Sequence, residues 1–246
     1  MPCIDINCDL GEGMANDALL MPFISSANIA CGFHAGDEAT IRKTIRLAIA
    51  NKVSVGAHPG FADKENFGRK EVELPAEGYY HLTIEQLHLF RRVTIEEGAP
   101  LHHVKAHGAL YNMAAKNAMI ARELVRAVVD FDPSLILYGL SNSFMLSEAE
   151  KFGLKSASEV FADRTYQEDG SLTPRVQKNA LLNEVDAARQ QVLMMAGQQK
   201  VIATSGNIIP VKADTICIHG DGEYAVAFAK AIYDVLKEKN IEIKSI

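Results

Sequence analysis

The stretch Asp5-Ile6-Asn7-Cys8-Asp9-Leu10-Gly11-Glu12-Gly13 contains the pattern that the rest of the chain repeats. Side chains alternate between the two faces of a strand, so Asp5, Asn7 and Asp9 share one side. Three polar side chains on one side are costly in an apolar layer unless they are paired or line a site. Glu12 follows between two glycines, which allow a tight turn and close approach of a ligand. We therefore predict a strand that ends in a functional turn; the alternative is a polar strand end that only caps the next helix.

The same rhythm recurs along the chain: a short apolar run ends in a small or polar cluster, and an amphipathic helix pattern follows. Several runs are nearly continuously apolar, as strands covered on both faces are. Successive units are roughly 30–35 residues long, the spacing of βαβ connections. The predicted strands are 3–7, 28–32, 53–58, 103–107, 135–139, 159–162, 201–204 and 215–219.

Helix signals lie between these runs. Asp37 precedes an apolar stripe and predicts an N-cap, and Thr83 and Gln86 have the spacing of a capping box at the start of another helix. The clearest pattern comes last, where one apolar face contains Ala225, Phe228, Ala229, Ile232, Val235 and Leu236.

Two α/β architectures fit: a closed β/α barrel of seven or eight mostly parallel strands, or an open doubly wound sheet. Nearly every predicted strand delivers polar residues at its C-terminal end. A barrel gathers all these ends on one face, whereas an open sheet gathers only a few at its switch point. We therefore predict one single-domain β/α barrel over residues 1–246. The strand-end residues are Asn7, Asp9, His34, Asp37, His58, Lys105, His107, Asp163, Arg164, His219 and Asp221.

Composition excludes several classes of protein. The 25 Lys+Arg against 31 Asp+Glu give a net charge of -6, which argues against a nucleic-acid binder or a protein held on anionic membranes. No apolar run approaches the roughly 18 residues of a spanning helix. Neither a P-loop nor a GxGxxG motif follows a strand. The four cysteines form no CxxC pair and the first residues resemble no export signal, so we expect a cytoplasmic protein.

Histidines mark the predicted strand ends. His34, between Gly32 and Gly36, is suited to acid/base work or an anion contact. Lys105 and His107 share one side of a strand, where a buried lysine could have a lowered pKa or hold an oxygen as a cation. We interpret Cys31 as a small buried hydrophobe, and the remaining histidines as structural: His81, His88, His102 and His103.

Asp163, Arg164 and Arg175 have the arrangement of a carboxylate-recognition loop, and a surface salt-bridge loop is the alternative. His219 precedes a glycine-rich helix start suited to an oxyanion or a phosphate. Histidine and aspartate sets also bind divalent metals, but the spacing matches no metal signature, so we expect no bound metal.

Six segments together resemble the LamB/YcsF family, the A subunits of prokaryotic 5-oxoprolinase. The departures from the family pattern are Ile6, Cys8 and Ala106, where the family usually has Leu, a small residue and Pro. The resembling segments are DINCDLGEG (5–13), SANIACGFHAGD (26–37), GAHPGFADKENFGR (56–69), VKAHGALYN (104–112), EVFADRTYQEDGSLTPR (159–175) and ICIHGDGE (216–223).

The resemblance implies ATP-dependent opening of 5-oxo-L-proline to L-glutamate, with release of ADP and phosphate. It also implies a β/α barrel related to glycoside hydrolases and carbohydrate deacetylases, and partner subunits B and C. ATP would be a co-substrate of the complex, and the missing P-loop agrees with nucleotide binding elsewhere. Nucleic acid and membranes are not expected as partners.

We assign the roles on this basis. The expected catalytic residues are Asp9, Glu12, His34, Lys105, His107 and Asp163. The expected substrate-binding residues are Asn7, His58, Arg69, Tyr111, Asn112, Arg164, Arg175, His219 and Asp221. An acidic residue would orient water, His34 or His107 would transfer protons, Lys105 would stabilise charge on oxygen, and Arg164 or Arg175 would hold the substrate carboxylate.

Two other functions remain open at this point. A stand-alone metal-dependent deacetylase or amidohydrolase would need stoichiometric metal. A non-catalytic scaffold or substrate-delivery subunit would have no need for four histidines on one face.

Overall fold

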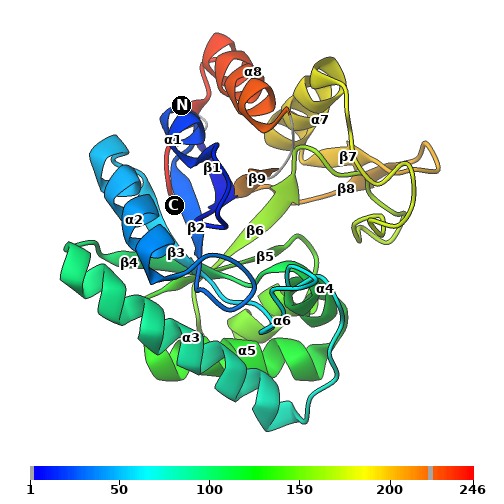
Figure 1. Ribbon diagram of the computed structural model, residues 1–246. Helices are drawn as coiled ribbons and strands as arrows, with labels where there is room; N and C mark the ends of the chain where they lie inside the picture. Colours follow the sequence, from blue (N-terminus) through cyan, green and yellow to red (C-terminus); the bar gives the residue numbers. More distant parts are fainter. Residues whose placement is uncertain (1–2, 221–223) are drawn as a thin grey trace.

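Seven parallel strands close into a barrel in the computed structural model, which describes residues 3–220 and 224–246. β9 pairs with both β6 and β1, and this pairing closes the barrel (Figure 1). The predicted β/α barrel is therefore confirmed. The strands around it are β1 (Cys3–Leu10), β2 (Ser26–Ala30), β3 (Ser54–His58), β4 (Leu101–Lys105), β5 (Ile136–Leu140), β6 (Ser156–Phe161) and β9 (Thr215–His219).

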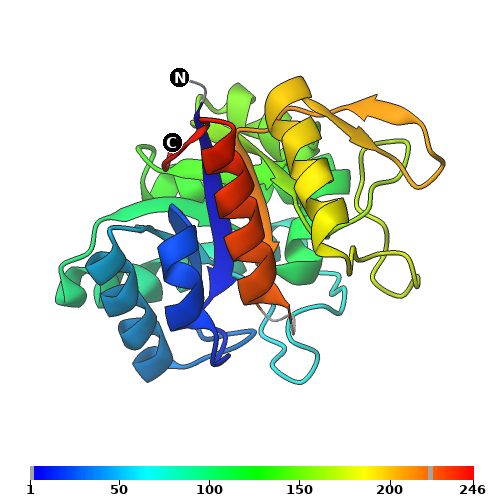
Figure 2. The same ribbon diagram turned by 90° about the horizontal axis from the view of Figure 1, so that it is seen from above.

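Helices surround the barrel. Figure 2 shows α8 lying across β1 and β9, and its buried face consists of the six apolar residues that the sequence pattern predicted. The Asp37 carboxylate accepts the Thr40 N–H at 2.8 Å, which confirms it as the N-cap of α2. None of the described helices is long and apolar enough to cross a membrane. The helices are α1 (Asp17–Leu20), a 3-10 turn (Met21–Phe23), α2 (Glu38–Asn51), α3 (Ala76–Glu97), α4 (Gly108–Lys116), α5 (Ala118–Phe131), α6 (Phe144–Lys151), α7 (Val185–Gln198) and α8 (Ala225–Glu238).

Two local predictions were wrong. The run at 201–204 does not join the barrel: β7 (Lys200–Ile202) pairs antiparallel with β8 (Ile208–Pro210) in a hairpin that projects from the barrel (Figure 1). Thr83 and Gln86 lie inside α3, because the helix already begins after Pro75. A further short strand, β10 (Glu242–Ile243), pairs with the beginning of β1.

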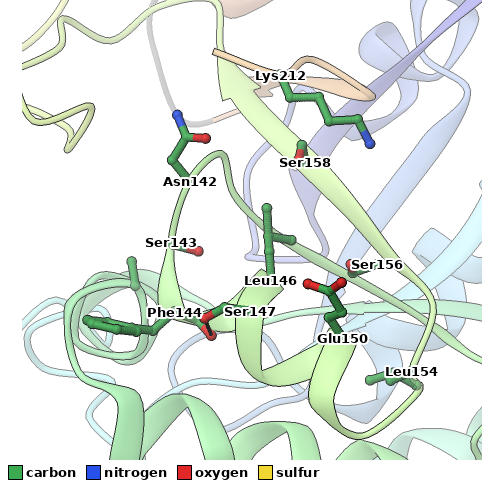
Figure 3. Close-up of a pocket in the computed structure, with 11 residues that line it drawn as sticks. Asn142, Ser143, Phe144, Leu146, Ser147, Glu150, Leu154, Ser156, Ser158 and Lys212 are labelled. Carbon is green, nitrogen blue, oxygen red and sulfur yellow. Dashed lines mark hydrogen bonds between the residues drawn. The ribbon is translucent and has the colours of Figure 1, made fainter. Parts of the chain in front are cut away.

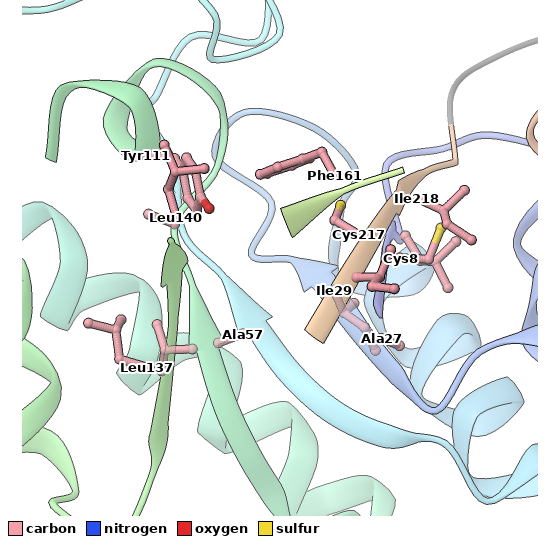
Figure 4. Packing of buried hydrophobic residues seen from close by; sticks show 14 of the residues in the cluster. Cys8, Ala27, Ile29, Ala57, Tyr111, Leu137, Leu140, Phe161, Cys217 and Ile218 are labelled. Carbon is pink, nitrogen blue, oxygen red and sulfur yellow. The ribbon is translucent and has the colours of Figure 1, made fainter. Parts of the chain in front are cut away.

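The two faces of the barrel wall differ in polarity. Outward-facing side chains such as Cys8, Ile29 and Ile218 pack in the apolar layer between strands and helices (Figure 4). The alternate side chains of β1 point inward, and Asp5 Oδ2 accepts the Thr215 hydroxyl at 2.6 Å. Burial raises the pKa of Asp5, although hydrogen bonds from hydroxyl groups oppose this rise. The barrel interior is thus a hydrogen-bonded polar stack that leads up to the strand ends.

Candidate active site

A pocket of about 400 Å³ opens at the C-terminal ends of the strands, where the barrel argument placed the site. It brings together most of the residues predicted from sequence. Asn7, Glu12, His34 and Asp163 are not among its lining residues, and Asp221 lies outside the described residues. The lining includes Asp9, His58, Arg69, Lys105, His107, Tyr111, Asn112, Phe161, Arg164, Arg175 and His219.

Lys105 lies at the floor of this pocket. Its Nζ is 2.8 Å from Asp9 Oδ1, 2.9 Å from Glu159 Oε1 and 3.0 Å from Cys217 Sγ. Burial lowers the pKa of this ammonium, but the neighbouring acidic groups outweigh that effect and hold the pKa well above its usual value. Of the two roles considered for Lys105, the structure therefore favours the permanent cation.

Asp9 is correspondingly kept ionised. Burial would raise its pKa, but His58 and Lys105 lower it more, so that it lies well below the ordinary value. The carboxylate also accepts the Asn28 amide at 2.8 Å. Asn28 lies between Asp9 and Asn7. Its amide donates a second hydrogen bond, at 2.7 Å, to the side-chain oxygen of Asn7. Asn7 is thus part of the scaffold beneath the pocket, which differs from the predicted substrate contact.

Glu159 contacts the lysine at the pocket floor, and the sequence reasoning did not single it out. Its Oε1 pairs with Lys105, and its Oε2 accepts the Tyr111 hydroxyl at 2.6 Å. Burial and this bond raise the pKa of Tyr111 well above its usual value. The available signal was a carboxylate at the beginning of the apolar run predicted as the strand 159–162, because core positions are rarely carboxylates.

His58 and His107 form a short row beside Lys105. His58 Nδ1 donates to the Lys105 carbonyl at 2.7 Å, and His107 Nε2 donates to the Phe67 carbonyl at 2.9 Å. The remaining ring nitrogens, His58 Nε2 and His107 Nδ1, are 2.9 Å apart. Phe67 has φ = 55°, an uncommon conformation for a non-glycine residue, and its carbonyl orients the His107 ring.

His34 stacks face to face on His107, with ring centroids 3.7 Å apart and an angle of 2° between the planes. Its Nε2 lies 3.2 Å from Glu12 Oε1, whereas its Nδ1 is buried without a hydrogen-bond partner. Burial lowers the pKa of His34 to about 3, so the ring stays neutral. A neutral imidazole does not donate a proton as a general acid, and the predicted acid/base role of His34 stays a prediction.

His219 and Asp163 form a pair at the pocket wall. His219 Nδ1 lies 2.9 Å from Asp163 Oδ2, and the ring stacks on Phe161. Burial opposes ionisation of Asp163, but His219 lowers the pKa more, so the net shift is downward. A carboxylate that holds one imidazole nitrogen fixes the ring orientation and leaves the other nitrogen for proton transfer.

The arginines divide into two groups. Arg164 is buried, and its guanidinium donates to the backbone carbonyls of Thr173 and Ala180 at 2.6 and 3.2 Å. Burial lowers its pKa to about 10. Arg175 is exposed and lines the pocket, as does Arg69. Arg164 thus anchors the loop, whereas Arg175 is placed to receive an anion. At the pocket edge, the Asn112 side-chain amide donates a hydrogen bond to the Gly108 carbonyl.

The residues interpreted as structural behave as expected. Burial raises the pKa of the Cys31 thiol to about 12, which leaves it protonated. His103 Nε2 shares a hydrogen bond of 2.8 Å with Asn28 Oδ1, and its ring stacks on Tyr138. His81 and His88 are exposed on α3.

A larger pocket, of about 680 Å³, lies on the outer side of the barrel between α6 and β6 (Figure 3). Its walls include Asn142, Ser143, Phe144, Ser158 and Lys212. None of the described strand-end residues lines it, so the chemistry is expected at the smaller pocket.

Two groups of side chains in the described part of the chain could hold a metal ion. One consists of Glu12, His34, His58 and His107, and the other of Asp9, Cys217 and His219. Ammonium, carboxylate and imidazole groups thus converge at one end of the barrel, an arrangement suited to hydrolysis with charge developing on an oxygen.

Comparison with known proteins agrees with this architecture. The A subunit of a 5-oxoprolinase from Brevibacillus brevis is 47% identical over 248 residues, covering 99% of this chain and 98% of that protein. The protein of the same name from Tolumonas auensis is 48% identical over 250 residues, covering both chains completely.

Solved structures show the same fold. A lactam utilization protein from Thermus thermophilus superposes with a TM-score of 0.93 at 38% identity, covering 99% of this chain and 100% of that one. A family 4 carbohydrate esterase from Streptomyces lividans reaches a TM-score of 0.56 at 11% identity, covering 100% and 93%, which is a likeness of fold alone. The family model described as LamB/YcsF matches residues 4–246. This chain belongs to the LamB/YcsF family.

Proposed function

We propose that this chain is the A subunit of an ATP-dependent 5-oxoprolinase, which opens 5-oxo-L-proline to L-glutamate with release of ADP and phosphate. The observation that carries the proposal is the similarity, at 47–48% identity over nearly the full length, to relatives named as the A subunit of 5-oxoprolinase. The pocket supports it, because its cationic and hydrolytic groups suit a small lactam that bears one carboxylate.

The requirement for ATP has a chemical reason. A five-membered lactam is a resonance-stabilised amide without strain, and water at neutral pH is a weak nucleophile. Attack of the amide oxygen on the γ-phosphorus of ATP expels ADP and leaves an O-phosphorylated imidate. Water then adds to the activated carbon, and the C–N bond breaks to release the amine and leave an acyl phosphate. A second water hydrolyses this acyl phosphate to glutamate and inorganic phosphate.

We assign the hydrolytic part of this sequence to the present chain. The Lys105 ammonium stabilises negative charge that develops on oxygen, since it is held as a cation at the pocket floor. Asp9, ionised beside it, orients water. His219, oriented by Asp163, transfers protons in place of the fully buried His34. Arg175 holds the substrate carboxylate, because its guanidinium is exposed at the pocket.

Partner subunits B and C complete the proposed enzyme and contribute the nucleotide site. The sequence contains neither a P-loop nor a GxGxxG motif after a strand. The second candidate, a stand-alone metal-dependent deacetylase or amidohydrolase, is favoured by one observation, the cluster of three histidines and Glu12. The two candidates differ in their need for ATP and partners.

The test is glutamate release from 5-oxoproline by the purified chain, with and without ATP and the two partner subunits. We expect release only with the full set and ATP. Lys105→Met or His107→Gln should abolish turnover in an assembled complex, whereas Lys43→Met, on the exposed side of α2, should retain it. No release from a verified complex, or wild-type rates in the Lys105 and His107 variants, would refute the proposal.

A further inference from the structure

Two histidines at the end of the barrel each point one ring nitrogen at the other. The Lys105 and Phe67 carbonyls only accept hydrogen bonds, so His58 Nδ1 and His107 Nε2 carry the hydrogens that bind them. In the neutral rings the other nitrogens, His58 Nε2 and His107 Nδ1, therefore carry lone pairs. These two atoms lie 2.9 Å apart, and the contact is repulsive unless a proton or a metal cation lies between them.

More electron-pair donors converge on the same point. Glu12 Oε1 is 3.3 Å from His107 Nδ1 and 3.2 Å from His34 Nε2. One donor atom from each of Glu12, His34, His58 and His107 lies within 4.8 Å of all the others, and all four residues are buried. Beyond this group, Asp9 Oδ2 approaches His58 Nε2 at 3.4 Å.

We propose that Glu12, His58 and His107 bind one divalent transition-metal ion beneath the pocket, with His34 as an additional ligand. Bonds of about 2.1 Å place neighbouring ligand atoms about 3.0–3.4 Å apart in octahedral or tetrahedral sites. The separations of 2.9, 3.2 and 3.3 Å lie close to that range. His34 stacks parallel to His107, so its ring must tilt before both rings can share an ion.

The donor set indicates the class of ion. Imidazole and carboxylate ligands suit Zn²⁺, Mn²⁺, Fe²⁺ or Co²⁺, whereas Mg²⁺ and Ca²⁺ prefer all-oxygen sites. The group of Asp9, Cys217 and His219 is less suitable. The Lys105 ammonium lies 3.0 Å from Cys217 Sγ and 2.8 Å from Asp9 Oδ1, and so repels a second cation there.

The proposed site differs from the expectation of no bound metal. The sequence spacing matched no metal signature because the ligands come from different elements. The ligands come from the turns after β1 and β2, from the end of β3 and from the residue before α4. No two of them share an element with metal-ligand spacing, so a sequence pattern cannot reveal the site. Only closure of the barrel brings them together.

The inference does not depend on the proposed reaction, because binding is measured on the isolated, untagged full chain. After treatment with EDTA and dialysis, titration with Zn²⁺ followed by elemental analysis should give one equivalent per chain. His58→Gln and His107→Gln should weaken binding by roughly 10²-fold or more. His81→Gln, which changes an exposed histidine of α3, should bind as the wild type does.

Co²⁺ provides a second readout that separates the two candidate groups. The spectrum of the Co²⁺-loaded chain should lack a thiolate charge-transfer band, and Cys217→Ser should leave it unchanged. Circular dichroism verifies that each variant is folded. If a histidine variant fails to fold, the binding measurement uses Glu12→Gln in its place. No stoichiometric binding by the wild type, binding unchanged in folded His58 and His107 variants, or a thiolate band removed by Cys217→Ser would each overturn the assignment.

Discussion

Glu159 Oε1 lies 2.9 Å from Lys105 Nζ, and the two side chains are 0% and 2% exposed. Two charges buried in this way stabilise each other only while both are present, since removal of one leaves the other desolvated without compensation. Tyr111 binds the second oxygen of Glu159, so the carboxylate connects the floor of the pocket to α4. Glu159 is therefore a positioning residue that, together with Asp9, keeps Lys105 charged and in place.

Glu159→Gln should destabilise the fold and lower turnover together. The amide keeps the shape but loses the charge, and a buried pair broken on one side costs about 3–5 kcal/mol. The measurement is the free energy of unfolding by urea, with kcat determined in the assembled complex. Glu38→Gln is the control, because Glu38 pairs with Arg92 and Arg42 on the exposed side of α2. A loss for Glu159→Gln no larger than that of the control would contradict this assignment.

The sequence predicted the barrel well because each strand end carries its own signal. Asn7 and Asp9 share a side by simple alternation, and their convergence with His58, Lys105 and His219 follows once the strands close. The pairings within the interior could not be predicted this way. Glu159 reaches Asn7 across 152 residues of sequence, and neither residue alone indicates that contact.

Loop roles were harder to predict than strand ends. Arg164 and Arg175 have the same chemistry, and only the fold distinguishes the buried loop anchor from the exposed guanidinium. Thr83 and Gln86 have the spacing of a capping box, although no helix begins there. In the structure Gln86 binds the backbone of Gly60 from the middle of α3, which holds the turn after His58. Tertiary contacts thus overrode a local signal.

Asp163→Asn should lower kcat by roughly 10²-fold or more, because His219 loses the carboxylate that orients its ring. The variant also reports on stability. The pKa of Asp163 is depressed in the folded state, so its contribution is present above the unfolded value of about 3.9 and is lost as the pH falls through the lower folded value.

The free energies of unfolding of the wild type and of Asp163→Asn should therefore differ above about pH 4 and converge as the pH falls from there through the lower folded pKa of Asp163. Chemical unfolding at a series of pH values measures this difference. A gap that stays constant down to the acid limit would show that Asp163 does not contribute through its charge.

The two loop arginines should respond in opposite ways. Arg175→Ala should raise KM for 5-oxoproline by roughly tenfold or more, with little change in unfolding free energy, since the side chain is exposed. Arg164→Ala should destabilise the chain by about 1–3 kcal/mol, because it removes the guanidinium that donates to the Thr173 carbonyl, whereas the Ala180 carbonyl keeps the Thr165 N–H. Steady-state kinetics and urea unfolding on both variants test the division, and the reverse pattern would exchange the two roles.

Gly68 provides a test of the stacked histidines that does not touch their rings. At φ = +62° a side chain is already unfavourable, and an added Cβ would lie 2.8 Å from His34 Cβ and 3.0 Å from His107 Cδ2. Gly98, at φ = +72° on the C-cap of α3, carries the same backbone penalty of about 1–2 kcal/mol but faces open space. Gly68→Ala should therefore cost more unfolding free energy than Gly98→Ala, by about 1–3 kcal/mol. It should also reduce turnover, because the His34 and His107 rings must shift to make room. Equal losses of unfolding free energy in the two variants would mean that the His34 and His107 rings move aside at no cost. That result would contradict the view that the fold holds these rings in place.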